Sequence, residues 1–261
     1  MDDLRPIEAP ADAVCGPDGC EVPGPAGSTT EAMLPAAKQA VGTRIDIVSD
    51  AICPWCYVGK RHLEAALTEL AAEGLHFSVH WNPFQLNPDM PKEGVDRASY
   101  RAAKFGSAER SREIDARVAG AAQAAGLAFR QDLMLRTPNT IDAHRLIWFA
   151  GRENRADLQD AVMEAVFRAY FIQGKDIGEA AVLGDCAAEA GLDRATVLDF
   201  LGSGVADAEM RASDKAAREA GVSGVPSFFL DGYGLFSGAM PAGQMAEAFR
   251  RGRLILEQQE R

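Results

Sequence analysis

The tetrapeptide Cys-Pro-Trp-Cys at residues 53–56 constrains this 261-residue chain more than any other segment. It follows an apolar, strand-like run at 45–48 and precedes a helical pattern at 58–70. This order puts Cys53 at a helix N-terminus, where free backbone N–H groups and the helix dipole stabilise a thiolate. Cys56 lies one turn further along the same helical face and can close a disulfide with Cys53. The segment therefore predicts a dithiol–disulfide redox centre.

Pro54 suits the first turn of a helix because proline has no N–H to satisfy and its φ is already near helical. Two other interpretations of the motif stay open. A second pair, Cys15 and Cys20, could complete a four-cysteine zinc site, although no knuckle glycine directly follows Cys56. A structural disulfide is the other, although this spacing at a helix start favours a strained, reducible bridge. The four histidines show no metal-ligand spacing, so we expect no metal.

Charge and hydropathy exclude several classes of function. The net charge of −11 argues against binding to nucleic acid or anionic membranes, which select for basic patches. No apolar run approaches the length of a membrane span. The N-terminus has neither the basic nor the apolar region of an export signal, so we expect a cytoplasmic location. Paired cysteines in that compartment are more often redox-active or metal-binding than structural.

Residues 1–40 predict a tail, because proline, glycine, alanine and acidic residues dominate and little apolar surface is available for burial. Within it, Cys15 and Cys20 enclose the turn-forming pairs Gly-Pro and Asp-Gly, so a small disulfide loop is sterically easy. Residues 23–30 predict a flexible linker.

The remaining chain predicts a β-α-β unit, a helical block and an α-β-β-α unit. Strands at 44–49 and 75–84, joined by a helix of about twenty residues, predict a parallel pair with a right-handed crossover. Later expected elements are a strand at 224–230, a turn at 231–232, a strand at 233–237 and a helix at 241–257. Further helices are expected at 107–125, 141–153, 156–171, 179–190, 194–201 and 205–220. We therefore expect a sheet domain from 41–95 and 216–261, interrupted by a helical insertion domain at 96–215.

This order of elements, with a cysteine pair after the first strand and Pro226 opening the third, resembles the α/β thioredoxin fold. The resemblance implies a cis bond between Val225 and Pro226 that lies against the cysteine pair. A cis bond there would leave the Val225 backbone free to pair with an extended substrate.

The chain is more narrowly similar to the DsbA family, and within it to the FrnE-like branch of predicted dithiol–disulfide isomerases. An ordered set of segments from about residue 44 to 236 carries this resemblance: 49–50, 53–59, 87–88, 139–140, 143–145, 170–171, 176–177 and 221–226. Related 2-hydroxychromene-2-carboxylate isomerases and kappa-class glutathione transferases have serine in place of Cys53 and bind glutathione. Some FrnE-like proteins have a second cysteine pair in a C-terminal tail, which suggests a disulfide relay through Cys15 and Cys20 here.

Several other side chains are candidates for auxiliary roles. Trp55 is expected both to pack and to form part of the substrate rim. Asp46 lies on the first strand and could accept the proton of Cys56, or be an ordinary polar strand residue. His144 could face the active site or pack between helices, and Cys186 is expected to be a buried small hydrophobe.

The resulting hypothesis is a thiol–disulfide oxidoreductase or isomerase that acts on disulfide-containing proteins or small thiols and needs no metal or organic cofactor. Cys53 attacks the substrate and Cys56 resolves the mixed disulfide. Glutathione remains a candidate co-substrate. The alternatives are a glutathione-dependent isomerase or transferase and a redox-sensing or zinc-binding module.

Overall fold

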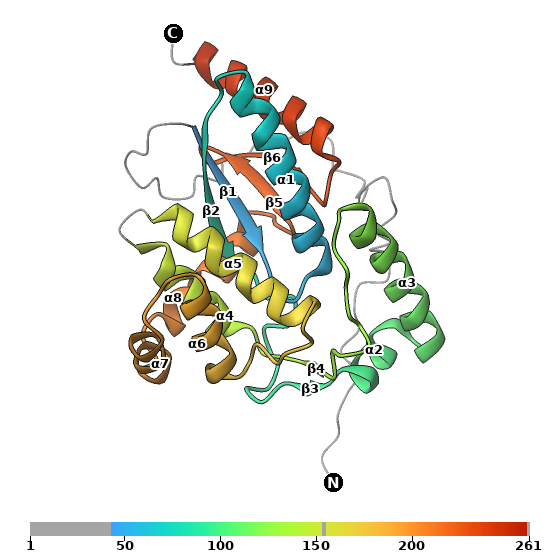
Figure 1. The fold of residues 1–261 in the computed structure, drawn as a ribbon. Helices are drawn as coiled ribbons and strands as arrows, with labels where there is room; N and C mark the ends of the chain where they lie inside the picture. The colour runs from blue at the N-terminus through green and yellow to red at the C-terminus, as the bar shows by residue number, and fades with distance from the viewer. Residues whose placement is uncertain (1–42, 153–154, 260–261) are drawn as a thin grey trace.

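A four-stranded mixed sheet forms the centre of the computed structural model, which describes residues 43–152 and 155–259 (Figure 1). Its strands lie in the order β2 (Phe77–Pro83), β1 (Thr43–Ser49), β5 (Ser227–Leu230) and β6 (Tyr233–Ser237). β1 pairs in parallel with β2 and antiparallel with β5. The predicted parallel pair is thus confirmed, and the two halves of the chain share one sheet.

Helices cover both faces of this sheet. On one face, α1 (Pro54–Ala72) lies beside α9 (Ala242–Gln259), and Ile45 and Ile47 of β1 are buried in the same apolar core as both helices (Figure 1). Val48 joins a second cluster on the other face with Ala217 of α8 (Asp207–Glu219). The alternation follows from the two-residue period of a strand.

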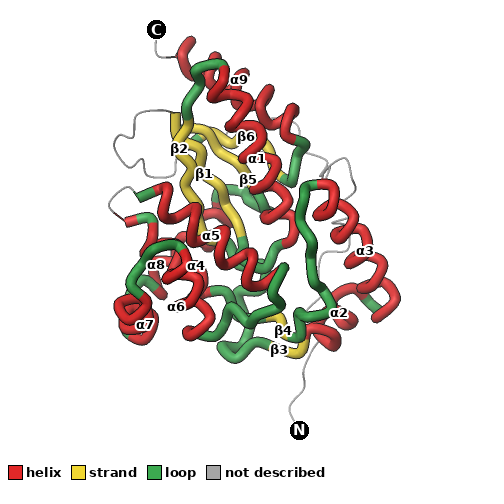
Figure 2. Tube along the Cα trace, in the orientation of Figure 1, coloured by secondary structure: helices red, strands yellow, loops and turns green. Residues whose placement is uncertain are grey.

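Between β2 and β5 the chain forms a mainly helical segment. Its elements before α8 are α2 (Arg97–Phe105), α3 (Ala108–Ala124), α4 (Ile141–Ala150), α5 (Ala156–Phe171), α6 (Ala180–Glu189) and α7 (Arg194–Gly202). The segment also contains a short antiparallel ladder of β3 (Val95–Asp96) and β4 (Arg136–Thr137), visible in Figure 2. The sequence did not predict this ladder, because two-residue strands show no periodicity.

The hydrophobic core is continuous between the sheet and the inserted helices. It contains Ile47 of β1 and Leu63 of α1 together with Phe167 of α5, all almost completely buried. Cys186 is buried in this core, as predicted. The division into a sheet domain and a helical insertion domain stays a prediction. The tail at residues 1–40, with Cys15 and Cys20, lies outside the described residues.

The hairpin after β5 matches its predicted position. Asp231 and Gly232 have φ values of 46° and 88°, the left-handed conformation that a tight two-residue hairpin requires at both central positions. β6 and α5 have the predicted bounds, 233–237 and 156–171. Strong local signals therefore placed these elements correctly.

Candidate active site

Cys53 is the N-cap residue of α1, in extended conformation with φ −84° and ψ 114°. A tight turn after β1 positions it, since the Cys53 amide donates to the Asp50 carbonyl at 3.0 Å. Pro54 begins the helix, and the first turn contains no acidic side chain. The positive end of the helix dipole at Cys53 is therefore not offset by a neighbouring carboxylate on α1.

Cys56 lies beneath Cys53 within hydrogen-bonding reach of its thiol. The two cysteines are not joined by a disulfide, and they are 4% and 1% exposed. Burial raises the pKa of Cys56 well above its usual value, and the neighbouring Cys53 raises it further. Ser49 and the backbone of Asp50 oppose this rise in the Cys56 pKa. The pair thus combines an outer sulfur at a helix terminus with an inner thiol held neutral by its surroundings.

Val225 and Pro226, which directly precede β5, lie against Cys53. The Val225–Pro226 peptide bond is cis, and the Val225 carbonyl accepts a hydrogen bond from the Cys53 thiol at 3.5 Å. Gly59 on α1 allows this close approach: a Cβ there would lie 3.1 Å from Cγ of Pro226. Val225 and Pro226, the residues expected to bind substrate, therefore lie at the candidate nucleophile although they are far from it in sequence.

Asp50 and His144 meet behind the turn that leads to Cys53. Asp50 is completely buried, and its carboxylate accepts a hydrogen bond from the Leu86 amide at 2.7 Å. His144 Nε2 lies 3.5 Å from the same carboxylate and 3.1 Å from the Phe84 carbonyl. His144 thus contacts the residue that supports the turn, and the structure gives it no contact with either sulfur.

Asp46 does not approach Cys56, contrary to the auxiliary role considered for it. Its carboxylate forms a two-pronged ion pair with Arg44 and accepts a hydrogen bond from Asn82 at 2.9 Å. The reason is strand alternation, which turns Asp46 to the sheet face opposite Ile45 and Ile47. Asp46 thus has the contacts of an ordinary polar strand residue, which was the other alternative considered for it.

Pro54 and Trp55 form part of the surface around the pair. Both are partly exposed, and Trp55 also packs against the main core. Trp55 thus packs against the core, as expected from the sequence, and stays partly exposed. Their contact with a substrate stays a prediction.

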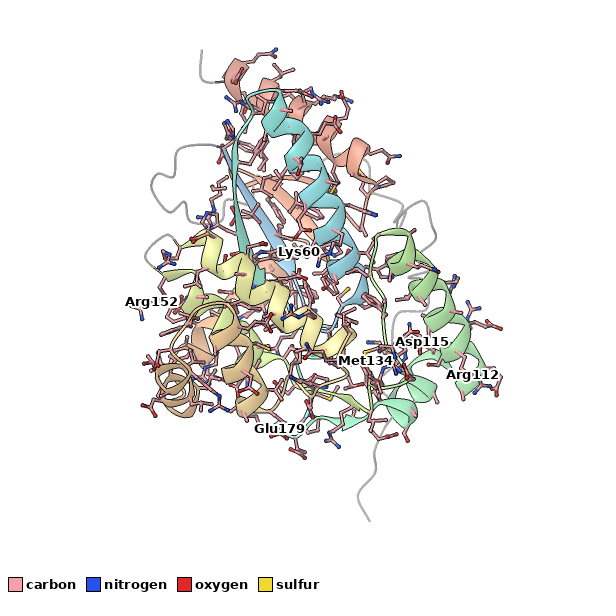
Figure 3. The ribbon with its side chains drawn as sticks, viewed as in Figure 1. Lys60, Arg112, Asp115, Met134, Arg152 and Glu179 are labelled. Atoms are coloured by element: carbon pink, nitrogen blue, oxygen red, sulfur yellow. The ribbon has the colours of Figure 1, made fainter. Side chains whose placement is uncertain are left out.

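A charge cluster around the buried Lys60, one turn beyond Cys56, was not predicted from the sequence. Lys60 of α1 is 2% exposed and lies between α1 and α5, where it pairs with Asp160 at 3.0 Å and Glu164 at 3.3 Å (Figure 3). Burial opposes its charge, but Asp160, Glu64 and Glu164 together raise the pKa of Lys60. One feature of the sequence could have indicated this cluster: Lys60 lies on the same helix face as the apolar residues Cys56 and Leu63.

The matched region shows the family of this chain. Residues 44–250 match the family described as the DsbA-like thioredoxin domain, and this range contains the cysteine pair, Pro226 and the inserted helices. The chain belongs to the DsbA-like family. It therefore has the fold of DsbA-like thiol–disulfide oxidoreductases.

Three relatives illustrate the range of this DsbA-like family. A probable DsbA oxidoreductase from Streptomyces coelicolor is 32% identical, with a TM-score of 0.70 over 80% of this chain and 89% of that structure. The uncharacterized protein YwbO from Bacillus subtilis is 27% identical, over 71% of this chain and 86% of that protein. The cytosolic disulfide reductase DsbM from Pseudomonas aeruginosa, in a structure with GSH, is 22% identical. It has a TM-score of 0.51 over 83% of this chain and 98% of that chain, and so shows the fold alone.

Residues 43–152 and 155–259 also bear on the expectations about membranes and metals. No helix in this part of the chain has the length and apolar character needed to cross a bilayer. Within the same residues, no group of three or more histidine, cysteine or acidic side chains could hold a metal ion. A site that also used Cys15 and Cys20 lies outside the described residues.

Proposed function

We propose that this DsbA-like protein is a thiol–disulfide oxidoreductase in which Cys53 is the nucleophile and Cys56 the resolving thiol. The supporting observation is the position of Cys53: it caps α1 with no acidic neighbour in the first turn, above Cys56 and beside the Val225 carbonyl. Disulfide-containing proteins or small thiols are the substrates, and the reaction needs no metal or organic cofactor. The FrnE-like assignment and the cytoplasmic location stay predictions.

In the reductive direction, the Cys53 thiolate attacks one sulfur of a substrate disulfide and forms a mixed disulfide. The other substrate sulfur leaves as a thiolate and takes a proton from water. Cys56 then loses its proton and attacks the Cys53 sulfur, which releases the second substrate thiol. The substrate gains two electrons and the Cys53–Cys56 pair becomes a disulfide; the oxidative reaction is the reverse.

Reduction of insulin disulfides, with dithiothreitol as electron donor, tests this proposal. Replacing Cys53 by serine should lower the rate by about a thousandfold or more, because it removes the nucleophile. Cys56→Ser should form a mixed disulfide that mass spectrometry detects, without efficient turnover. Cys186→Ala is the matched control, since Cys186 is also buried but its Sγ contacts the Ala165 carbonyl in the helical segment. Insulin reduction by Cys53→Ser at the native rate would refute the proposal.

A glutathione-dependent isomerase or transferase is the second candidate, supported by the similarity in fold to a DsbM structure with GSH. This activity would need a glutathione site at the start of α1 but not the resolving thiol. It therefore predicts that Cys56→Ala remains fully active when glutathione is supplied. Loss of turnover in Cys56→Ala with glutathione present would favour the dithiol mechanism.

The N-terminal pair Cys15–Cys20 is proposed to relay disulfides to Cys53. Cys20 precedes Thr43, where β1 starts, by 23 residues, a stretch that can span at most about 75 Å. β1 itself is only about 23 Å long, so the reach suffices. The Cys15→Ser/Cys20→Ser double variant should slow oxidation by an external acceptor without changing the reaction of Cys53 with iodoacetamide. An unchanged oxidation rate would exclude the relay.

A further inference from the structure

Ser49 is the last residue of β1 and is 1% exposed, yet no hydrogen bond satisfies its hydroxyl among the described residues. Its backbone carbonyl is engaged, because it accepts the Phe84 amide at 3.0 Å. A buried hydroxyl without a partner destabilises a fold, so stability alone favours alanine at this position. Packing and stability therefore do not explain why a serine occupies this position.

The neighbour of this hydroxyl is the inner thiol of the cysteine pair. Ser49 lies on the same face of the sheet as Ile45 and Ile47, the face that α1 covers. Its side chain is close enough to the Cys56 thiol to lower the pKa of that thiol. The hydroxyl does not complete a hydrogen bond of ordinary geometry with the neutral thiol. The Ser49 hydroxyl is thus a hydrogen-bond donor beside Cys56, and no other described residue accepts its proton.

We propose that Ser49 is a positioning residue for the resolving step, and that its hydroxyl donates a hydrogen bond to the Cys56 sulfur when Cys56 ionises to attack the mixed disulfide. This inference rests on the proposed function. In the step, the Cys56 proton passes to solvent and the new thiolate forms the S–S bond with Cys53 as the substrate sulfur leaves. A donor to a buried anion stabilises it more than a donor to a neutral group does.

The charged side chains near Cys56 are already paired and are therefore not available to donate a hydrogen bond to the Cys56 thiolate. The Asp50 carboxylate is engaged by the Leu86 amide and lies next to His144. Lys60, one turn along α1, is ion-paired with acids of α5. Asp46 is on the other face of the sheet with Arg44. Each of these side chains already has a partner of its own.

The test follows two releases of thionitrobenzoate from Ellman's reagent. The first release comes from attack by Cys53, and the second comes when Cys56 attacks the Cys53–thionitrobenzoate mixed disulfide. Ser49→Ala should slow the second release about tenfold at pH 7 and leave the first unchanged. The rate–pH curve of the second release should move about one unit to higher pH. Ser49→Thr, which keeps a hydroxyl, should restore most of the rate.

Ser78→Ala is the matched control, because Ser78 of β2 also has a buried hydroxyl with no partner in the part of the chain that the structure describes, but lies opposite Arg44, at the far end of β1. It should leave both releases unchanged. The thermal midpoint of Ser49→Ala should equal or exceed that of the wild type, which separates a kinetic role from misfolding.

Two outcomes would overturn the inference, and they are distinguishable. If the second release is equally fast in Ser49→Ala and wild type across the pH range, Ser49 has no part in resolution although the proposed function holds. If the wild type gives no second release that depends on Cys56, the dithiol mechanism fails, and the role of Ser49 fails with it.

Discussion

The first turn of α1 and the turns that follow it differ sharply in how their charges are satisfied. At the N-terminus, Cys53 has no capping hydrogen bond from its side chain to the helix and no acidic neighbour in the first turn. One turn after Cys56, Lys60 is surrounded by Glu64, Asp160 and Glu164. The same helix thus leaves its positive end available for chemistry while its middle is fixed to α5.

This difference explains how a reactive end is held in place. The Tyr57 hydroxyl donates to Glu164 at 2.8 Å, and its ring stacks on Phe167 with a centroid separation of 4.9 Å. On the sheet side, Gly59 faces Pro226, because a Cβ added at Gly59 would lie 3.1 Å from Cγ of Pro226. These contacts hold the helix between α5 and the start of β5, and so hold Cys53 next to Val225.

Replacing Lys60 by methionine should have the largest effect on stability. Removing one member of a buried charge cluster leaves the others without compensation, but Glu64, Asp160 and Glu164 are partly exposed and solvated. We therefore expect a loss of about 2 kcal/mol in the free energy of unfolding, below the usual range for a fully buried pair. Urea denaturation at pH 7 measures it. Lys215→Met, at an exposed lysine paired with Glu219 at 3.6 Å, should change stability by less than about 0.5 kcal/mol.

The contribution of Lys60 should also depend on pH. Its pKa is raised in the folded state, so its stabilisation is complete below the usual lysine value of 10.5 and is lost as the pH rises through the folded-state pKa. The pKa of Glu164 is lowered despite burial, mainly by Lys60, so its stabilisation is present above 4.5 and is lost as the pH falls. The stability gap between wild type and Lys60→Met should therefore be widest between these limits. A gap independent of pH would mean that packing, and not charge, fixes α1 to α5.

Gly59→Ala should have an intermediate effect on stability and activity, because the added methyl group crowds the space between α1 and Pro226. The added methyl would lie 3.1 Å from Pro226 and 3.7 Å from the backbone of Ala239. Relieving this overlap should cost about 1 kcal/mol and slow insulin reduction severalfold, because Val225 moves with Pro226. Gly120→Ala in α3 meets no atom within 4 Å and should instead stabilise by about 0.5–1 kcal/mol. If the two substitutions change the free energy of unfolding equally, the space between Gly59 and Pro226 can accommodate a methyl group without strain.

Trp55→Glu should have the smallest effect, since it places an acid in the first turn of α1 and offsets the helix dipole. One such charge amounts to about 0.3–1 kcal/mol at a helix terminus. The rate of Cys53 alkylation by iodoacetamide at pH 7 and low salt should therefore fall about twofold to fivefold relative to Trp55→Gln. Added salt should narrow the difference. If the two variants react at the same rate, the dipole does not influence the Cys53 thiolate.

Sequence patterns predicted those parts of the fold whose signals are local. Apolar, strand-like patterns placed β1 and β2, the turn pair Asp231–Gly232 placed the hairpin, and Pro54 was placed in the first turn of α1. The ladder of β3 and β4 was missed, because two-residue strands depend on a partner about 40 residues away. The cysteine pair was predicted from the residues, and the approach of Val225 and Pro226 to it was implied by the family resemblance. The role of Asp46 was left open between two alternatives.

The sequence by itself determined where the thiols lie and how the chain is ordered, because helix caps, strand periods and tight turns depend on neighbouring residues. Only the tertiary structure decided which side chains meet. Lys60 meets Asp160 across 100 residues. Val225 meets Cys53 across 172 residues, an approach that the family resemblance implied but no local pattern showed. Such contacts depend on how the sheet and the inserted helices pack, and no local pattern encodes that packing. The position of Ser49 beneath Cys56 belongs to the same class, since it follows from the placement of α1 over the end of β1.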